Sequence, residues 1–87
     1  MTKIEVEFLG DPLAALPFGV KPEAVLDATH GRFTRVEVEA VPDGVAGHWR
    51  VFFDFTLEGQ APADLRLFLR SAERTLSETW LFPFRPA

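Results

Sequence analysis

Hydrophobic and polar residues alternate along most of the chain, which is the pattern of half-buried β-strands. Residues 3–9 show it most plainly, because Ile4, Val6 and Phe8 share one parity while the charged Lys3, Glu5 and Glu7 share the other. The segments between such stretches are rich in glycine and proline. The strands that this pattern predicts span residues 3–9, 23–29, 33–41, 48–57, 63–70 and 76–84.

Turns rather than helices separate these predicted strands. Residues 10–22 contain three prolines and two glycines, and proline lacks the N–H group that a central strand needs. We therefore expect a loop over the edge of the domain, anchored by Leu13 and Leu16. A helix is expected only briefly, near residues 12–16 or 71–74. Six or seven short strands joined by such turns predict an all-β fold, an antiparallel β-sandwich.

Charge pairing gives a hypothesis for the order of the strands. A hairpin through the turn at 58–62 places strand 48–57 between strands 33–41 and 63–70. The outer neighbours in this register are Arg35 and Asp54, Asp54 and Arg66, Glu39 and Arg50, and Phe52 and Phe68. The inner neighbours are Val36 and Phe53, Phe53 and Leu67, and Phe55 and Leu65, with Val38 and Ala40 also inward.

The composition is that of a globular domain and excludes several functions. The 87 residues are 47% hydrophobic, and a net charge of −4 disfavours nucleic acid and anionic membranes, which select basic faces. No apolar run approaches the roughly 20 residues of a membrane span, and the first ten residues alternate instead of forming a signal-peptide core. With no cysteine, a disulfide and a thiolate metal site are also excluded.

Candidate catalytic groups do not form a recognisable set. His30 and His48 lie in separate turns, with no second ligand at a metal-binding spacing, so neither a metal nor a cofactor is predicted. Ser77 and Glu78 are adjacent, and adjacent strand residues point to opposite faces. Asp54 is within reach of arginine, and an arginine-paired carboxyl is poorly suited to be a general acid. No catalytic residue is predicted. The residues interpreted as members of structural ion pairs are Asp54, Arg35, Glu39 and Glu78.

Two phenylalanines of the outer parity predict a contact surface. Phe52 and Phe68 point away from the leucine-rich face and are opposite each other in the predicted register. The polar residues expected to surround them are Arg50, Arg66 and Arg70. An exposed apolar patch with a polar rim is typical of an interface, and it suits a monomer or a weak homodimer when the chain is alone.

The last segment, LSETWLFPF, allows two interpretations, because Glu78 shares the parity of its aromatic residues. If this strand joins the sheet opposite strand 63–70, Trp80 fills the core and Glu78 lies at its rim, within reach of Arg66 or Arg70. If it pairs with strand 63–70, Trp80 and Phe82 join the outer aromatic patch. In either arrangement we expect Glu78 to pair with an arginine.

Three motifs carry a resemblance to a known family. The runs GHWRVFFDF, ADLRLFLR and LSETWLF, in this order and at these spacings, resemble the C-terminal domain of the periplasmic glucan biosynthesis proteins G and D. The stretch VEFLGDPLAALP is similar to the start of that domain. The resemblance covers nearly the whole chain. It implies an immunoglobulin-like sandwich of six or seven strands, which in the family follows a larger N-terminal β-sandwich that holds the glucan cleft and its acidic residues.

The resemblance also implies a function and a location. Residues 1–87 are expected to form one C-terminal accessory domain without catalytic activity, in the periplasm. Its expected partner is the N-terminal glucan-processing domain of the same parent protein, which lies outside this chain and takes part in the synthesis of osmoregulated periplasmic glucans. The alternative is a carbohydrate-binding module in which Trp49 or Trp80 stacks on glucan, and this requires a solvent-exposed tryptophan.

Overall fold

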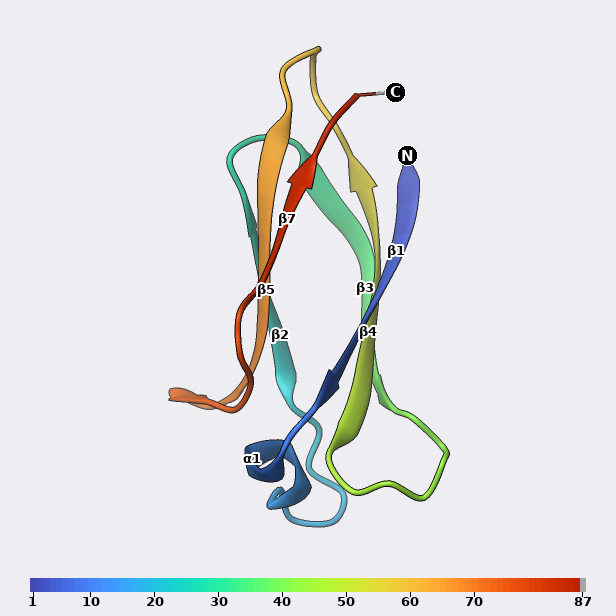
Figure 1. Cartoon of the computed structure of the whole chain (residues 1–87), viewed down its shortest axis with the longest axis vertical. Helices are drawn as coiled ribbons and strands as arrows, with labels where there is room; N and C mark the ends of the chain where they lie inside the picture. Colours follow the sequence, from blue (N-terminus) through green and yellow to red (C-terminus); the bar gives the residue numbers. More distant parts are fainter. Residues whose placement is uncertain (87) are drawn as a thin grey trace.

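Seven strands and one turn of helix make up the part of the chain that the computed structural model describes, residues 1–86 (Figure 1). The strands of the first sheet are, in spatial order, β1 (Thr2–Leu9), β4 (His48–Thr56) and β3 (Arg32–Ala40). The strands of the second sheet are β2 (Glu23–Ala28), β5 (Ala63–Ser71), β6 (Arg74–Thr75) and β7 (Trp80–Phe84). The helix is α1 (Asp11–Ala14). The paired strands are antiparallel, so the predicted antiparallel β-sandwich is confirmed.

The strand order is that of an immunoglobulin domain. β4 lies between β1 and β3, and β5 lies between β2 and β7. This arrangement corresponds to strands B-E-D and C-F-G of an immunoglobulin constant domain. Figure 1 shows the two sheets facing each other, with β1 and β7 along the edge nearer the viewer. The predicted immunoglobulin-like fold is therefore confirmed.

The predicted hairpin between strands 48–57 and 63–70 is wrong. β4 and β5 belong to different sheets, and the residues between them carry the chain from one sheet to the other. The inner residues of the two strands thus face each other across the sandwich instead of lying side by side. Placing β4 and β5 in facing sheets is favoured because the apolar inner residues of each strand then bury those of the other. If both strands lay in one sheet, a further layer would be needed to cover its apolar face.

The core lies between the inner faces of β4 and β5. The side chains of these strands that are at most 2% exposed are Val51, Phe53, Phe55, Ala63, Leu65, Leu67 and Leu69. Phe53 meets Phe33 edge to face, with ring centroids 5.4 Å apart, and Phe55 meets Phe84 in the same way at 4.9 Å. Edge-to-face contacts are a preferred geometry of aromatic pairs. The predicted inward orientation of these residues is confirmed.

A bulge interrupts the pairing of β3 with β4. Thr34 is opposite Asp54 and Glu37 is opposite Phe52, so Arg35 and Val36 together oppose a single residue of β4. Arg35 has a φ of 54°, in the left-handed region. The extra residue lets Phe33 and Val38, which have opposite parity, both pack against the core. Val36, predicted to face inward, is 42% exposed, and Ala40 is exposed as well.

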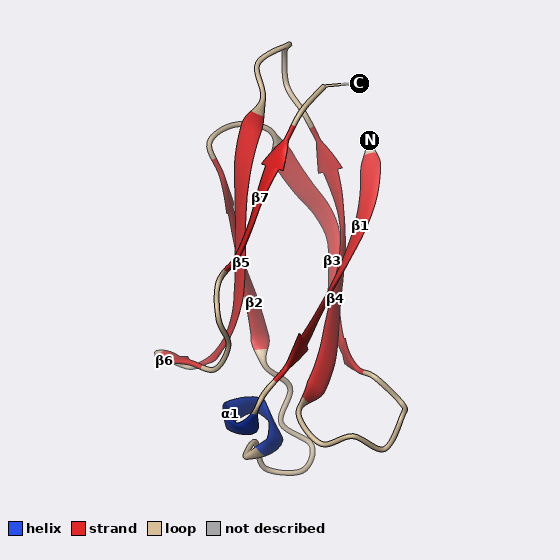
Figure 2. Ribbon diagram, in the orientation of Figure 1, coloured by secondary structure: helices blue, strands red, loops and turns tan. Residues whose placement is uncertain are grey.

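One end of the sandwich is closed by α1 and the loops 15–22 and 41–47 (Figure 2). Leu13 is buried and Leu16 packs against the core, which confirms both predicted anchors. The second loop approaches α1 at Gly47, whose φ is 77°. A Cβ atom there would lie 2.5 Å from the Gly10 carbonyl oxygen, so only glycine fits without displacement.

The last strand combines parts of both interpretations of the segment 76–84. β7 begins only at Trp80 and pairs with β5, where Trp80 is opposite the inward Leu67. Trp80 therefore also faces inward and meets Phe53 edge to face, with centroids 6.2 Å apart. Glu78 precedes the strand and is exposed, so it does not belong to the aromatic row.

Candidate functional site

The ion pairs of the first sheet match only some of the pairs predicted from the sequence. Arg50 Nε donates a hydrogen bond to Glu39 Oε1 at 2.6 Å, which confirms that predicted pair. Arg35 Nε lies 3.8 Å from Asp54 Oδ2, so this pair forms even though Thr34 occupies the register position opposite Asp54. Arg66 lies in the other sheet, opposite Asp27, and the predicted contact between Asp54 and Arg66 is wrong.

The predicted ion pair of Glu78 is also wrong. Within residues 1–86 the ion pairs do not include Glu78. Arg70, one of its expected partners, pairs instead with Glu23 of β2, with Arg70 Nη2 3.2 Å from Glu23 Oε1. The reason is that Glu23 is directly opposite Arg70 in the β2–β5 register, whereas Glu78 lies outside the strands.

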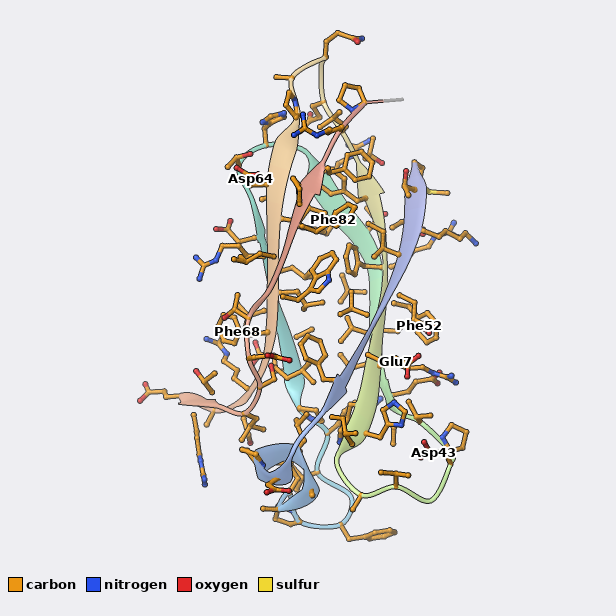
Figure 3. All side chains as sticks on the ribbon, viewed as in Figure 1. Glu7, Asp43, Phe52, Asp64, Phe68 and Phe82 are labelled. Atoms are coloured by element: carbon orange, nitrogen blue, oxygen red, sulfur yellow. The ribbon has the colours of Figure 1, made fainter. Side chains whose placement is uncertain are left out.

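Phe52 and Phe68 do not form one surface. Phe52 lies on the outer face of the β1–β4–β3 sheet, and Phe68 lies on the outer face of the other sheet, so the two rings point away from each other (Figure 3). Each is half-buried. The Arg50 guanidinium carbon lies 5.2 Å from the centre of the Phe52 ring, within the range of a cation–π contact.

The two tryptophans are half-buried and pack against the core. Trp80 stacks on Phe82 with an interplanar angle of 6° and centroids 5.4 Å apart. Phe82 itself is 42% exposed and lies between the two sheets near their open edge (Figure 3). Trp49 lies at the other end, beside the loops that flank α1. Phe82 thus covers one face of Trp80, whereas Trp49 is half-buried and lines the groove beside α1.

His48 is bound by two carboxylates, which the sequence did not reveal. Its Nδ1 donates to Asp43 Oδ2 at 2.6 Å, and its Nε2 donates to Glu7 Oε1 at 2.7 Å. Both ring nitrogens can donate only when the imidazole is protonated. The hydrogen bond to Asp43, followed by the one to Glu7, raises the pKa of His48 despite partial desolvation. The Val45 N–H group, followed by His48, lowers the pKa of Asp43.

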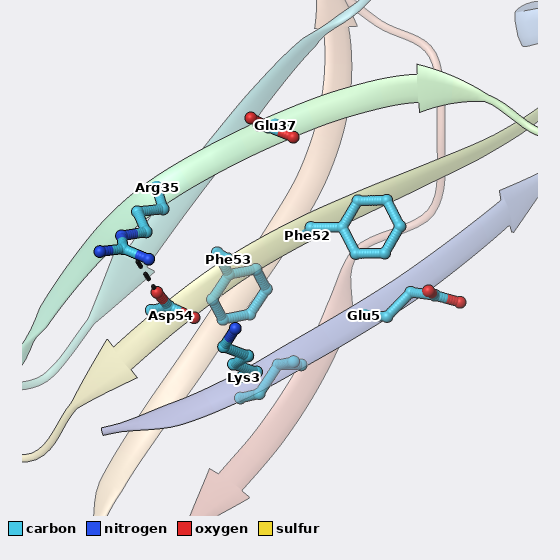
Figure 4. A pocket seen from close by; sticks show the side chains of 8 residues that line it. Lys3, Glu5, Arg35, Glu37, Phe52, Phe53 and Asp54 are labelled. Atoms are coloured by element: carbon cyan, nitrogen blue, oxygen red, sulfur yellow. Dashed lines mark ion pairs between the residues drawn. The ribbon is translucent and has the colours of Figure 1, made fainter.

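A depression on the outer face of the β1–β4–β3 sheet surrounds Asp54 (Figure 4). The Asp54 depression, as we call it, has a volume of about 410 Å³ and is lined by Lys3, Glu5, Arg35, Glu37, Phe52 and Asp54. Asp54 is only 4% exposed although it belongs to the outer face, and among residues 1–86 its Oδ2 atom has no hydrogen-bond partner. The alternation of residues predicted an exposed carboxylate here.

The loops beside α1 carry an exposed apolar surface. The apolar end, as we call it, consists of Leu16, Phe18, Val20, Val45 and Trp49, which line a groove of about 480 Å³. Phe18 is fully exposed, and Val45 is 49% exposed. One indication of this surface was present in the sequence. The proline-rich loop 10–22 contains Phe18 and Val20 in addition to the predicted anchors Leu13 and Leu16.

No helix within residues 1–86 is long and apolar enough to cross a membrane. The histidines, aspartates and glutamates of the same residues form no group of three or more that could hold a metal ion.

The strand order and the closed apolar core define an immunoglobulin-like β-sandwich domain. Residues 1–84 match the family described as periplasmic glucan biosynthesis protein MdoG, and the chain belongs to this family. It is 57% identical over 84 residues to glucans biosynthesis protein D 2 of Ralstonia nicotianae. It is 41% identical over 87 residues to glucans biosynthesis protein D of Stenotrophomonas maltophilia. Each match covers 97% of this chain but 16% of the relative, so the chain spans about a sixth of their length.

Proposed function

We propose that this chain is a non-catalytic accessory domain of a periplasmic glucan biosynthesis protein, located in the periplasm. In this proposal it packs through the apolar end against the larger remaining part of the parent protein and supports glucan processing there. Family membership supports the context, and the span of about 16% of the relatives supports the existence of a larger partner region.

The exposure of Phe18 is the observation that best supports a docking surface at the apolar end. A phenylalanine that is 107% exposed gains nothing from the fold of this chain alone. Val20 and Val45 are 38% and 49% exposed beside it, and together they border the groove. A contiguous apolar surface of this kind marks a contact site more often than scattered apolar residues do. The rest of the parent protein is the occupant, because it is joined to this domain covalently in the relatives.

This assignment replaces the surface that the sequence indicated. Phe52 and Phe68 lie on opposite outer faces, so they cannot contribute to one contact patch. The stacking of Trp80 on glucan is not favoured, because its ring stacks on Phe82 and packs against the core. Trp49 lines the groove of the apolar end, which this proposal assigns to the docking contact.

The docking surface can be tested by expressing this chain and the remaining part of the parent protein separately and measuring their co-purification. The double variant Phe18→Ser, Val45→Ser is expected to weaken co-purification, since it removes exposed apolar area without touching the core. Leu81→Ser is the matched control, because Leu81 is 66% exposed on the outer face of β7. Equal co-purification of the double variant and the parent chain would place the contact elsewhere.

The non-catalytic role has its own test. The purified chain is expected to release no product from glucan, whereas the remaining part of the parent protein is expected to lose stability or activity when this domain is deleted. Product formation by the chain alone, retained after further purification, would contradict the proposal.

A further inference from the structure

Among residues 1–86, Asp54 is the one buried charged residue, and it lies outside the apolar core. It points outward from β4, between Lys3 of β1 and Thr34 of β3, yet its side chain is only 6% exposed. Oδ2 has no hydrogen-bond donor among residues 1–86. The nearest cation, Arg35 Nε, is 3.8 Å away, which is too long for a hydrogen bond. Buried polar atoms are nearly always satisfied, so this acceptor calls for an explanation.

The backbone of β3 beside Asp54 is strained at Arg35, and this strain directs the Arg35 side chain toward Asp54. The bulge in β3 places Arg35 at a φ of 54°, a conformation that residues other than glycine rarely adopt. The result is that the Arg35 guanidinium lies over Asp54 while most of its side chain remains exposed (Figure 4). Bulges and left-handed residues cluster at ligand sites, where they aim a side chain.

The Asp54 depression offers donors, acceptors and an apolar ring within one small volume. Lys3 and Arg35 can donate hydrogen bonds, while Glu5, Glu37 and Asp54 can accept them. Phe52 contributes an aromatic side wall (Figure 4). Mixed charge disfavours a polyanion, and the arginine beside Asp54 disfavours a cationic ligand. A neutral ligand with many hydroxyl groups and an apolar C–H face satisfies all these groups, and about 410 Å³ accommodates a ligand of small-molecule size.

We propose that the Asp54 depression binds one sugar unit of a neutral glycan. The Asp54 carboxylate accepts a hydrogen bond from one hydroxyl, and the Arg35 guanidinium donates to a neighbouring hydroxyl. The part of the Phe52 ring that Arg50 leaves uncovered packs against the C–H face of the sugar. The existence of the site depends on Asp54, Arg35 and Phe52. Only the identity of the sugar as glucose in a glucan rests on the proposed function.

The test is a titration of the isotope-labelled chain with methyl β-glucoside and with a β-linked glucose disaccharide, followed by amide correlation spectra. We expect saturable shifts confined to residues 3–5, 35–37 and 52–54. Asp54→Asn is expected to weaken binding about tenfold or more, since a charged acceptor is lost. Arg35→Gly removes the guanidinium but suits the positive φ, so it keeps the fold while weakening binding. Asp64→Asn is the control, because Asp64 is exposed on the other sheet.

Three results would overturn the proposal. The first is an absence of shifts at these residues with both sugars. The second is Asp54→Asn and Arg35→Gly binding as tightly as the parent chain. The third is a response of the depression to an arginine- or lysine-containing peptide but not to sugars, which would assign it to a protein partner. The docking function is tested separately, because Asp54→Asn should co-purify normally and the double variant Phe18→Ser, Val45→Ser should still bind sugar.

Discussion

Arg35 Nε lies 3.8 Å from Asp54 Oδ2 although the residue opposite Asp54 in the strand register is Thr34. The contact exists because the bulge turns Arg35 through a positive φ and directs its side chain toward the carboxylate. Sequence alternation pointed to the correct pair of residues but to a regular ladder that the structure does not have.

The strain at Arg35 can be measured against a second residue with the same backbone. Ala72 has a φ of 53° in the turn between β5 and β6, so Ala72→Gly is expected to raise the free energy of unfolding by about 1 kcal/mol. Arg35→Gly relieves the same strain but loses the ion pair to Asp54, and its gain should be smaller. Urea unfolding of both variants checks this. A larger gain for Arg35→Gly would show that the ion pair contributes nothing.

Truncation of Phe53 tests the core. Phe53 is 2% exposed and contacts Phe33 and Trp80, so Phe53→Ala is expected to lower the free energy of unfolding by about 3–5 kcal/mol. Phe52→Ala, on the neighbouring position of the outer face, should cost clearly less because its ring is half-buried. Urea unfolding curves for the two variants provide the comparison. Equal losses would mean that the two faces of β4 have been assigned incorrectly.

The closure of the loop 41–47 on α1 depends on Gly47. Gly47→Ala places a Cβ atom 2.5 Å from the Gly10 carbonyl oxygen and 2.7 Å from the Ala14 nitrogen, at a φ of 77°. Gly44→Ala is the matched control, since Gly44 has a φ of 76° and open space around it. Both variants should lower the free energy of unfolding, because alanine is strained at a positive φ. The expected loss for Gly44→Ala is about 1 kcal/mol. Gly47→Ala should lower the free energy of unfolding further, and comparable losses would contradict the close packing against α1.

The His48 bridge gives the domain a pH dependence of stability. Because the folded pKa of His48 is raised, its stabilising effect is complete below the unfolded value of 6.5 and is lost as the pH rises through the folded pKa. Because the pKa of Asp43 is lowered, its effect is present above 3.8 and is lost as the pH falls through its folded pKa. We therefore expect the thermal midpoint to be highest between pH 3.8 and 6.5 and to decline as the pH rises above 6.5.

The variant His48→Gln checks the source of this dependence. It is expected to flatten the decline of the thermal midpoint above pH 6.5, because the charged bridge between Asp43 and Glu7 is removed. His30→Gln should keep the decline, since the His30 ring contacts the Ala61 carbonyl oxygen rather than a carboxylate. If His48→Gln follows the parent chain across the pH range, the bridge does not determine the dependence.

The sequence by itself determined most of the strands and the inner and outer faces of β4 and β5. A period of two places Val51, Phe53 and Phe55 on one side of β4, and the same side is buried in the structure. Each strand carries this information locally, because successive side chains of an extended chain must point to opposite faces. Leu13 and Leu16 were predicted as anchors of the loop 10–22, and both pack in or against the core, whereas Phe18 of the same loop is exposed.

The sequence placed β3 beside β4 and paired Glu39 with Arg50, but only the tertiary structure decided that β5 lies in the facing sheet and which distant polar groups meet. Alternation is satisfied equally by a hairpin and by a crossing to the facing sheet, so the position of β5 opposite β4 depended on burying both apolar rows at once. The bulge at Arg35 allows Phe33 and Val38, which have opposite parity, both to pack against the core. The same bulge places Arg35 at the Asp54 depression. The bridge from Glu7 to His48 and Asp43 joins residues distant in sequence, and only the folded sheet brings them together.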